Sequence, residues 1–154
     1  MGLLAWRLES VAAFDMLRSM GKGYEENQAR LALLQSFGKD LARRAKSTCE
    51  LSGKSGVPLR IYEVPPGPKE PDPERCLMLC DEVIDALAKP SLFKADEWRQ
   101  LGELIWSDQP MVQLMTVRIL QYLGQENPWC LEIIEEAYLD DEVLEEAGSS
   151  PLSG

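Results

Sequence analysis

The sequence predicts an all-α protein, built as stacked antiparallel helix pairs or a helical bundle, with one extended proline-rich segment near residues 57–74. Three observations predict this fold class. Apolar residues recur at helical spacing through most of the chain. Glycine or proline interrupts each periodic stretch. Only residues 57–64 combine β-branched and aromatic residues in the manner of a strand. An apolar fraction of 45% is ordinary for a folded protein.

The first 51 residues are expected to form an αα-hairpin. Residues 3–20 place apolar side chains along one helical face, and the glycines Gly21 and Gly23 end that helix. A second helix is predicted from about Tyr24 to Cys49, and basic residues near its end suit the negative end of the helix dipole. So short a turn between two helices makes them antiparallel neighbours.

Residues 52–74 interrupt the helical pattern. A strand is expected over 57–64, and five prolines follow within the nine residues 65–73. Proline neither continues a helix nor donates within a central strand, so this run favours an extended conformation. The segment is predicted to connect two domains. Its strand-like residues Ile61 and Tyr62 are candidate partner contacts, which dock on the chain's own helices or insert into another protein.

Residues 75–147 are predicted to form an acidic helical stack, followed by a flexible tail over 148–154. The first helix of this stack is expected to start at Cys76 and to end before Pro90. Five apolar residues define its buried face by their helical spacing. They are Cys76, Leu79, Cys80, Val83 and Leu87. A further helix is expected over about 95–106.

The strongest periodicity follows, over residues 112–123. Asp108 is a fitting N-cap for this helix and Gly124 a fitting end, and Asn127 is expected to cap the next helix in the same way. That last helix should start near Trp129 and bury one row of residues. The row is Cys130, Ile133, Ile134, Ala137, Tyr138, Val143 and Leu144.

Residues 104–124 resemble the junction and second helix of a HEAT repeat. The positions of the family pattern fall on Val112, Thr116, Val117, Leu120 and Gly124, although Gln113 stands where the family has arginine and Thr116 where it usually has alanine. The resemblance covers about one repeat, within residues 95–124 and the following helix. It implies a HEAT- or armadillo-like stack, and a generic helical bundle is the alternative.

Charge is distributed unevenly along the chain. Residues 1–69 hold 11 Lys/Arg against 7 Asp/Glu, whereas residues 70–154 hold 5 against 19, which together give the net charge of −10. An acidic half repels nucleic-acid phosphates, so nucleic acid is an unlikely ligand. We expect a protein partner with a basic segment, bound by the acidic residues near the last helix. A solvated, non-functional face is the alternative. The candidate residues are Glu135, Glu136, Asp140 and Asp141.

The sequence contains no histidine, which excludes Ser-His and Cys-His nucleophile pairs and His-containing zinc sites. Cys76 and Cys80 lie one helical turn apart in the predicted helix, but they share its apolar face. We therefore interpret them as buried structural thiols. No metal, cofactor or catalytic residue is predicted, and an enzyme is not expected.

The predicted function is a non-catalytic protein-interaction module, either an adaptor or an assembly subunit. Trp106 and Trp129 fall at helix junctions, where tryptophan packs neighbouring repeats or anchors a partner. The alternatives are an acidic helical decoy of a nucleic-acid-binding protein and, less favoured, an enzyme that uses carboxylates. The chain lacks the pattern of a signal peptide or membrane helix, so an intracellular location is expected. The oligomeric state is left open.

Overall fold

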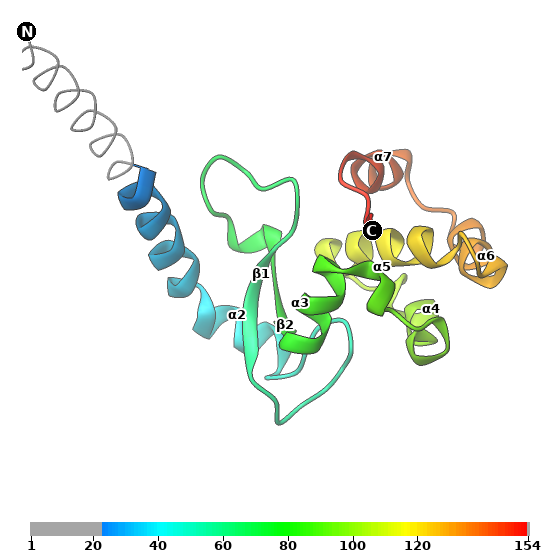
Figure 1. Ribbon diagram of the computed structural model, residues 1–154, viewed down its shortest axis with the longest axis horizontal. Helices are drawn as coiled ribbons and strands as arrows, with labels where there is room; N and C mark the ends of the chain where they lie inside the picture. Colours follow the sequence, from blue (N-terminus) through cyan, green and yellow to red (C-terminus); the bar gives the residue numbers. More distant parts are fainter. Residues whose placement is uncertain (1–22, 154) are drawn as a thin grey trace, which may run out of the picture. The chain divides into compact units, whose positions relative to one another are not determined.

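The computed structural model describes residues 23–153 (Figure 1). The chain forms two compact units, residues 1–36 and 37–154. In the first unit, residues 23–36 are helical, and the helix predicted over 3–20 lies outside the described residues. No helix within the described range is long and apolar enough to cross a bilayer.

The helix predicted to reach Cys49 ends earlier. A turn at Phe37 separates the helical residues 23–36 from helix α2, Gly38–Ala45. Lys46 then adopts a left-handed conformation with φ of 56°, and its N–H bonds back to the carbonyls of the last helical turn. A left-handed residue cannot continue a right-handed helix. The predicted hairpin over 1–51 is therefore divided by the boundary between the two compact units.

A two-stranded antiparallel sheet stands where a helix was predicted to begin. Strand β1, Leu59–Glu63, confirms the strand expected near residues 57–64, and it pairs with β2, Cys76–Cys80, with Ile61 opposite Met78. The all-α prediction was wrong in this respect, although most of the elements are helices. All five residues of β2 are buried. A short continuous apolar run fits a buried strand as well as a helix, and its pairing partner decides between them.

The proline-rich segment is the connection between the two strands. It leaves β1 at Val64 and returns through the 3-10 turn Pro73–Arg75, where the Val64 N–H donates to the Arg75 carbonyl at 2.9 Å. The chain therefore doubles back on itself here. Both ends of residues 52–74, which were predicted to connect two domains, lie in the compact unit 37–154.

A buried carboxylate fixes the loop that precedes β1. Glu50, whose side chain is 7% exposed, accepts two hydrogen bonds from Arg44, at 3.0 and 2.8 Å, and one from the Met78 N–H at 2.8 Å. The Arg44 guanidinium also donates to the Cys76 carbonyl at 2.8 Å. Such bidentate arginine–carboxylate contacts are directional, so this pair joins α2, the loop and β2.

Short helices follow the sheet. Helix α3, Asp81–Ala88, begins directly after β2, so the helix predicted from Cys76 starts five residues late. The predicted helix over 95–106 is replaced by two shorter pieces, the 3-10 helix Ala95–Trp98 and α4, Leu101–Leu104. Between α3 and these pieces lies another 3-10 turn, Pro90–Leu92.

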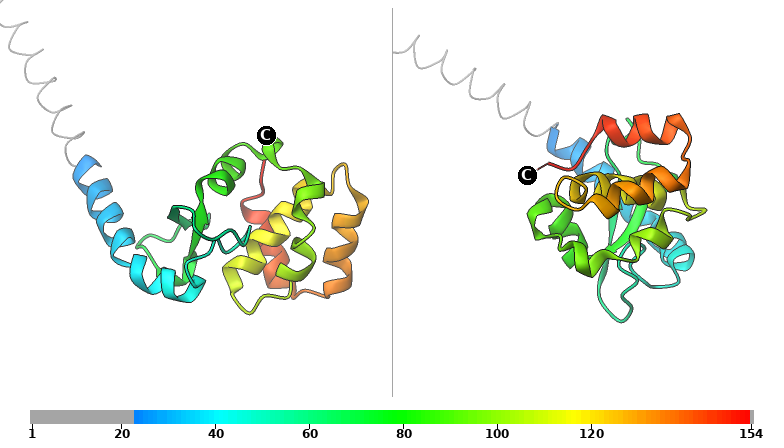
Figure 2. Two further views of the ribbon diagram at one scale, coloured as in Figure 1. Left: turned by 90° about the horizontal axis from the view of Figure 1, so that it is seen from below. Right: turned by 90° about the vertical axis from the view of Figure 1, so that its right-hand side faces the viewer.

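Helix α5, Pro110–Leu123, is the centre of the second unit and contacts α4, α6, α7 and β2 (Figures 1 and 2). Ten of its residues are buried. The predicted ends of this helix were nearly correct, since Gln109 is the N-cap in place of Asp108 and Gly124 follows the last residue. Helix α6, Pro128–Ala137, and α7, Asp141–Ser149, replace the single last helix that was predicted.

The junction of α5 and α6 leaves no room for a side chain. A Cβ atom on Gly124 would lie 2.4 Å from Leu131 Cδ2 and 2.9 Å from the Leu120 carbonyl oxygen. Asn127 occupies the N-cap position of α6, as predicted, but its side chain donates to the Leu123 carbonyl at 2.9 Å and does not cap the helix. The HEAT resemblance of this stretch stays a prediction.

Arg118 is buried in the middle of α5, with 1% of its surface exposed. Its guanidinium donates to the carbonyls of Glu146, at 2.9 Å, and Ala147, at 3.3 Å, in the last turns of α7, and also to the Pro65 carbonyl. A cation favourably meets the negative end of a helix. Burial lowers the pKa of Arg118, and nearby Tyr62 and Glu146 oppose that shift. Arg118 therefore joins α5, α7 and the proline-rich loop.

Candidate functional site: the turn between α6 and α7

Residues 135–141, which comprise the connection between α6 and α7 and the adjoining helix ends, hold the most exposed aromatic residue in the described part of the chain. We call these residues the α6–α7 turn. Tyr138 is 90% exposed, and its backbone is left-handed, with φ of 49° and ψ of 50°. The sequence pattern predicted Tyr138 to be buried with Cys130 and Ala137. That prediction was wrong for Tyr138, because the helix ends at Ala137 and the next residue leaves the helical register.

Four carboxylates surround Tyr138 in the sequence, and all four are exposed. Glu135 and Glu136 lie in the last turn of α6, and Asp140 and Asp141 lead into α7. None of these four carboxylates lies within 4 Å of a basic group in the part of the chain that the structure describes. Among the carboxylates of α6 and α7 in that part, only Glu146 pairs with a cation, which is Arg75.

The surrounding sequence supplies no compensating positive charge. After Arg118, the chain has no further lysine or arginine, but it has nine acidic residues. They are Glu126, Glu132, Glu135, Glu136, Asp140, Asp141, Glu142, Glu145 and Glu146. A single-sign cluster of this kind creates a local negative potential that attracts cationic ligands.

Helix stability explains Asp140 and Asp141, which stand at the positive N-terminal end of α7, but it does not explain Glu135 and Glu136. Carboxylates near a helix C-terminus are repelled by the negative end of the helix dipole, and α6 has two of them and no basic residue in its last turn. A left-handed residue after a helix is most often glycine, because a Cβ atom makes that conformation costly. Tyr138 therefore occupies a position where glycine would be more stable, while exposing an aromatic ring.

The two candidate tryptophans have different environments. Trp106 is 65% exposed and lies in the connection from α4 to α5. Trp129 is half-buried in the first turn of α6, where the Arg99 guanidinium lies 4.2 Å from the centre of its ring. This cation–π contact occupies one face of Trp129. Trp129 also lies at the opposite end of α6 from the α6–α7 turn, about 10 Å away along the helix axis.

Ile61 and Tyr62 belong to the sheet and not to the α6–α7 turn. Both are half-buried in β1, and Tyr62 packs against the hydrophobic core. Burial raises the pKa of Tyr62, while the nearby Arg118 charge opposes that shift. The sequence-predicted residues are thus divided between four places: strand β1, the α4–α5 connection, the start of α6, and the α6–α7 turn with its four carboxylates.

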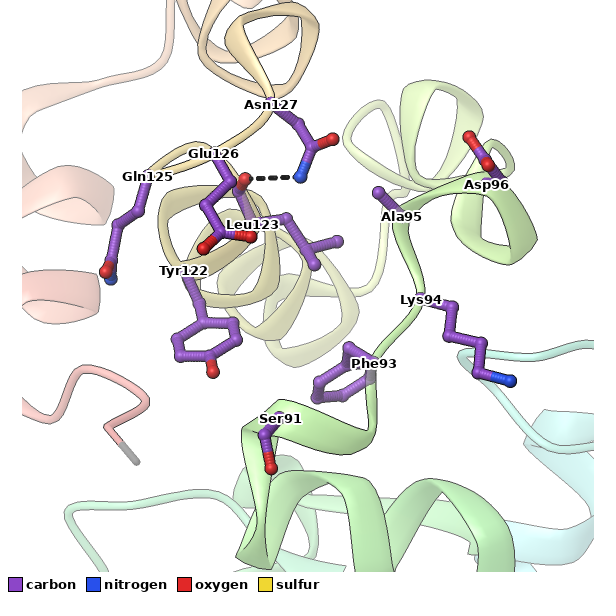
Figure 3. Close-up of a pocket in the computed structure, with 10 residues that line it drawn as sticks. All are labelled: Ser91, Phe93, Lys94, Ala95, Asp96, Tyr122, Leu123, Gln125, Glu126 and Asn127. Atoms are coloured by element: carbon purple, nitrogen blue, oxygen red, sulfur yellow. Dashed lines mark hydrogen bonds between the residues drawn. The ribbon is translucent and has the colours of Figure 1, made fainter.

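A separate hollow of about 570 Å³ lies between the connection from α3 to α4 and the C-terminal end of α5 (Figure 3). Its walls combine aromatic rings with charges of both signs. The residues that decide its character are Phe93, Lys94, Asp96, Tyr122 and Glu126. Because Lys94 offsets only one of the two carboxylates, this hollow has a small negative charge and gives no strong preference for an ionic ligand.

Buried polar groups of the described residues are all engaged within the protein, since no buried side-chain nitrogen or oxygen there lacks a hydrogen-bond partner. Among the same residues, no group of three or more histidine, cysteine, aspartate or glutamate side chains is placed to hold a metal ion. A comparison of this chain with protein-family models, curated proteins and solved structures found no match.

Proposed function

We propose that this protein is a non-catalytic interaction module, and that the α6–α7 turn binds a basic segment of a partner protein. The observation that carries the proposal is Tyr138, 90% exposed in a left-handed conformation and flanked by four exposed carboxylates. Backbone and charge choices that lower stability in one place are a recurrent mark of functional surfaces.

The chemistry of the turn suits arginine or lysine side chains. Carboxylates form charge-assisted hydrogen bonds with guanidinium and ammonium groups. An exposed tyrosine ring adds a cation–π contact, worth about 0.5–1 kcal/mol at an exposed site. Since Tyr138 lies within three residues of all four carboxylates along the chain, one basic segment can contact both kinds of group.

The direct test is an array of decapeptides in which the number of Lys and Arg residues varies from none to five, probed with the full chain at 0.1 M and 0.5 M salt. We expect binding to increase with positive charge and to weaken at high salt. The matched variants are Tyr138→Gly and, as a control on another helix, Tyr24→Ala, which removes a tyrosine that is 65% exposed.

Tyr138→Gly should weaken peptide binding several-fold and leave the fold intact or slightly more stable, because glycine accepts the left-handed conformation. Tyr24→Ala should bind as the parent does. If the array shows no preference for basic peptides, or if both variants lose binding equally, the proposal is contradicted.

A further inference from the structure

Two buried cysteines meet where the loop before β1 passes the start of α3. Cys49 is 1% exposed and Cys80 is 4% exposed. Ser52 contacts both sulfurs: its N–H donates to Cys49 Sγ at 3.4 Å, and its Oγ lies 3.7 Å from Cys80 Sγ. The backbone of Cys80 also lies close enough to the Cys49 thiol to lower its pKa. Two segments far apart in the sequence therefore place their thiols next to each other.

The loop that carries Cys49 is held in place by its own hydrogen bonds. The Cys49 N–H donates to the Lys54 carbonyl at 2.9 Å, the Gly53 N–H donates to the Cys49 carbonyl at 2.9 Å, and Thr48 forms a bridge with Ser55. Gly53 has a φ of 75°, which a residue with a side chain rarely adopts. Cys49 is thus fixed in position relative to β2.

The surroundings of Cys49 favour its thiolate form. Burial by itself would raise the pKa of the Cys49 thiol, but hydrogen bonds from Ser52, Cys80 and Leu51 lower that pKa overall. The thiolate is the nucleophile in sulfur chemistry. Cys49 is accordingly equipped to attack a neighbouring sulfur.

Of the two cysteines, Cys80 is the one that a small molecule can reach from solvent. It is the N-cap residue of α3, and its side chain makes no capping hydrogen bond there. It lines a hollow of about 240 Å³ together with Lys54, Val57 and Pro58. Lys54 lies close enough for its charge to interact with Cys80. A small oxidant entering this hollow would therefore meet Cys80 before Cys49.

The other two cysteines do not share this place. Cys76 stands at the opposite end of β2 from Cys80, about 13 Å away along the strand, and its thiol donates to the Asp72 carbonyl at 3.3 Å. Cys130 is buried in α6. A zinc site would need about four ligands, and no metal-binding cluster of three or more is found among the described residues.

We propose that Cys49 and Cys80 form a redox-active dithiol that a hydroperoxide converts to a disulfide. The Cys80 sulfur attacks the peroxide and gives up its proton, and the O–O bond breaks to give Cys80 sulfenic acid and, with hydrogen peroxide, one water. The Cys49 thiolate then attacks the Cys80 sulfur, the S–O bond breaks, and the hydroxide leaves as a second water. Two thiols lose two electrons and two protons, and the peroxide is reduced.

The test uses the full chain, oxidised with hydrogen peroxide, blocked with N-ethylmaleimide under denaturing conditions and mapped by mass spectrometry. Before blocking, we expect an intact mass two hydrogens lower. After blocking, we expect two maleimide adducts, a peptide pair that joins Cys49 to Cys80, and full reversal of that linkage by a thiol reductant. Cys130→Ser should form the same linkage, and Cys80→Ser should form none.

Linkage mapping of the parent protein decides the proposal even if Cys80→Ser does not fold. A disulfide that includes Cys76 or Cys130 in place of the expected pair would overturn it, and so would complete alkylation of all four thiols after oxidation. The dithiol is independent of the α6–α7 turn, so peptide binding and disulfide formation succeed or fail separately.

Discussion

Charged side chains serve different purposes around the sheet and at the α6–α7 turn. Around the sheet, three acidic side chains have a basic partner: Glu50 pairs with Arg44 at 2.8 Å, and two further pairs join the sheet and the loop before it to α3. Those pairs are Arg60–Asp81 and Lys54–Glu82. At the α6–α7 turn, four carboxylates face solvent without a cation among the described residues.

This difference separates charges that maintain the fold from charges that are free to bind. A buried, hydrogen-bonded ion is costly to leave without its partner, whereas exposed charges of one sign mainly repel each other and are screened by salt. The comparison therefore predicts large stability losses in the first region and almost none in the second.

The largest effect is expected for Arg118→Met. Methionine keeps much of the apolar volume but removes every hydrogen bond to the Pro65, Glu146 and Ala147 carbonyls. Buried carbonyls without partners cost about 1–3 kcal/mol each, and relaxation recovers part of that cost. We expect a loss of about 3 kcal/mol in the free energy of unfolding, measured by urea denaturation.

The matched control for Arg118→Met is Arg99→Met, because the Arg99 side chain is 64% exposed and makes, among the described residues, only one ring contact and one exposed ion pair, with Asp96 at 3.7 Å. Arg99→Met should lower the free energy of unfolding by less than about 1 kcal/mol. Equal losses in the two variants would show that the carbonyl contacts of Arg118 do not matter to stability.

An intermediate effect is expected for Glu50→Gln. The amide keeps the shape of the side chain but cannot accept both arginine hydrogen bonds with a full charge, so Arg44 loses its ionic partner. Because solvent can partly hydrate the Arg44 charge, we expect the free energy of unfolding to fall by about 2 kcal/mol. Glu135→Gln, at an exposed position, is the control, and thermal unfolding of the two variants side by side gives the comparison.

The smallest effect on stability is expected when the turn is neutralised by Glu135→Gln, Glu136→Gln, Asp140→Asn and Asp141→Asn together. Relief of like-charge repulsion and loss of the favourable charges at the N-terminus of α7 oppose each other, so the free energy of unfolding should change by less than about 0.5 kcal/mol. The same variant should lose the preference for basic peptides. A stability loss above 1 kcal/mol would assign these carboxylates to the fold.

Helices whose ends and periodicity are marked by nearby residues were predicted from the sequence. The strand that forms only by pairing with a distant segment was missed. Helix α5 was expected almost at its observed ends, because proline, glycine and a long apolar periodicity agree there. Strand β2 was missed, since Cys76, Leu79 and Cys80 also satisfy helical spacing. Only the pairing with β1, which depends on the return of the proline-rich loop, makes these residues a strand.

The acidic residues of the candidate site were predicted because they carry a local sequence signal, whereas its exposed tyrosine was not predicted. Charge counting located the carboxylates near the last helix without any knowledge of the fold. Tyr138 was missed because helical periodicity was continued one residue too far, past Ala137. The burial of Arg118 and Glu50 gave no sequence signal, since a lone arginine or glutamate in a helical or loop pattern usually faces solvent.

Gly124 has a consequence for finding relatives of this protein. Any side chain at position 124 would clash with the backbone of Leu120 and the side chain of Leu131. A protein that shares the packing of α5 and α6 is therefore expected to keep glycine at this position or to shift α6. Combined with Arg118 six residues earlier and Pro128 at the start of α6, it defines a short signature. Genome searches that weight these three positions should recover distant homologues that overall similarity misses.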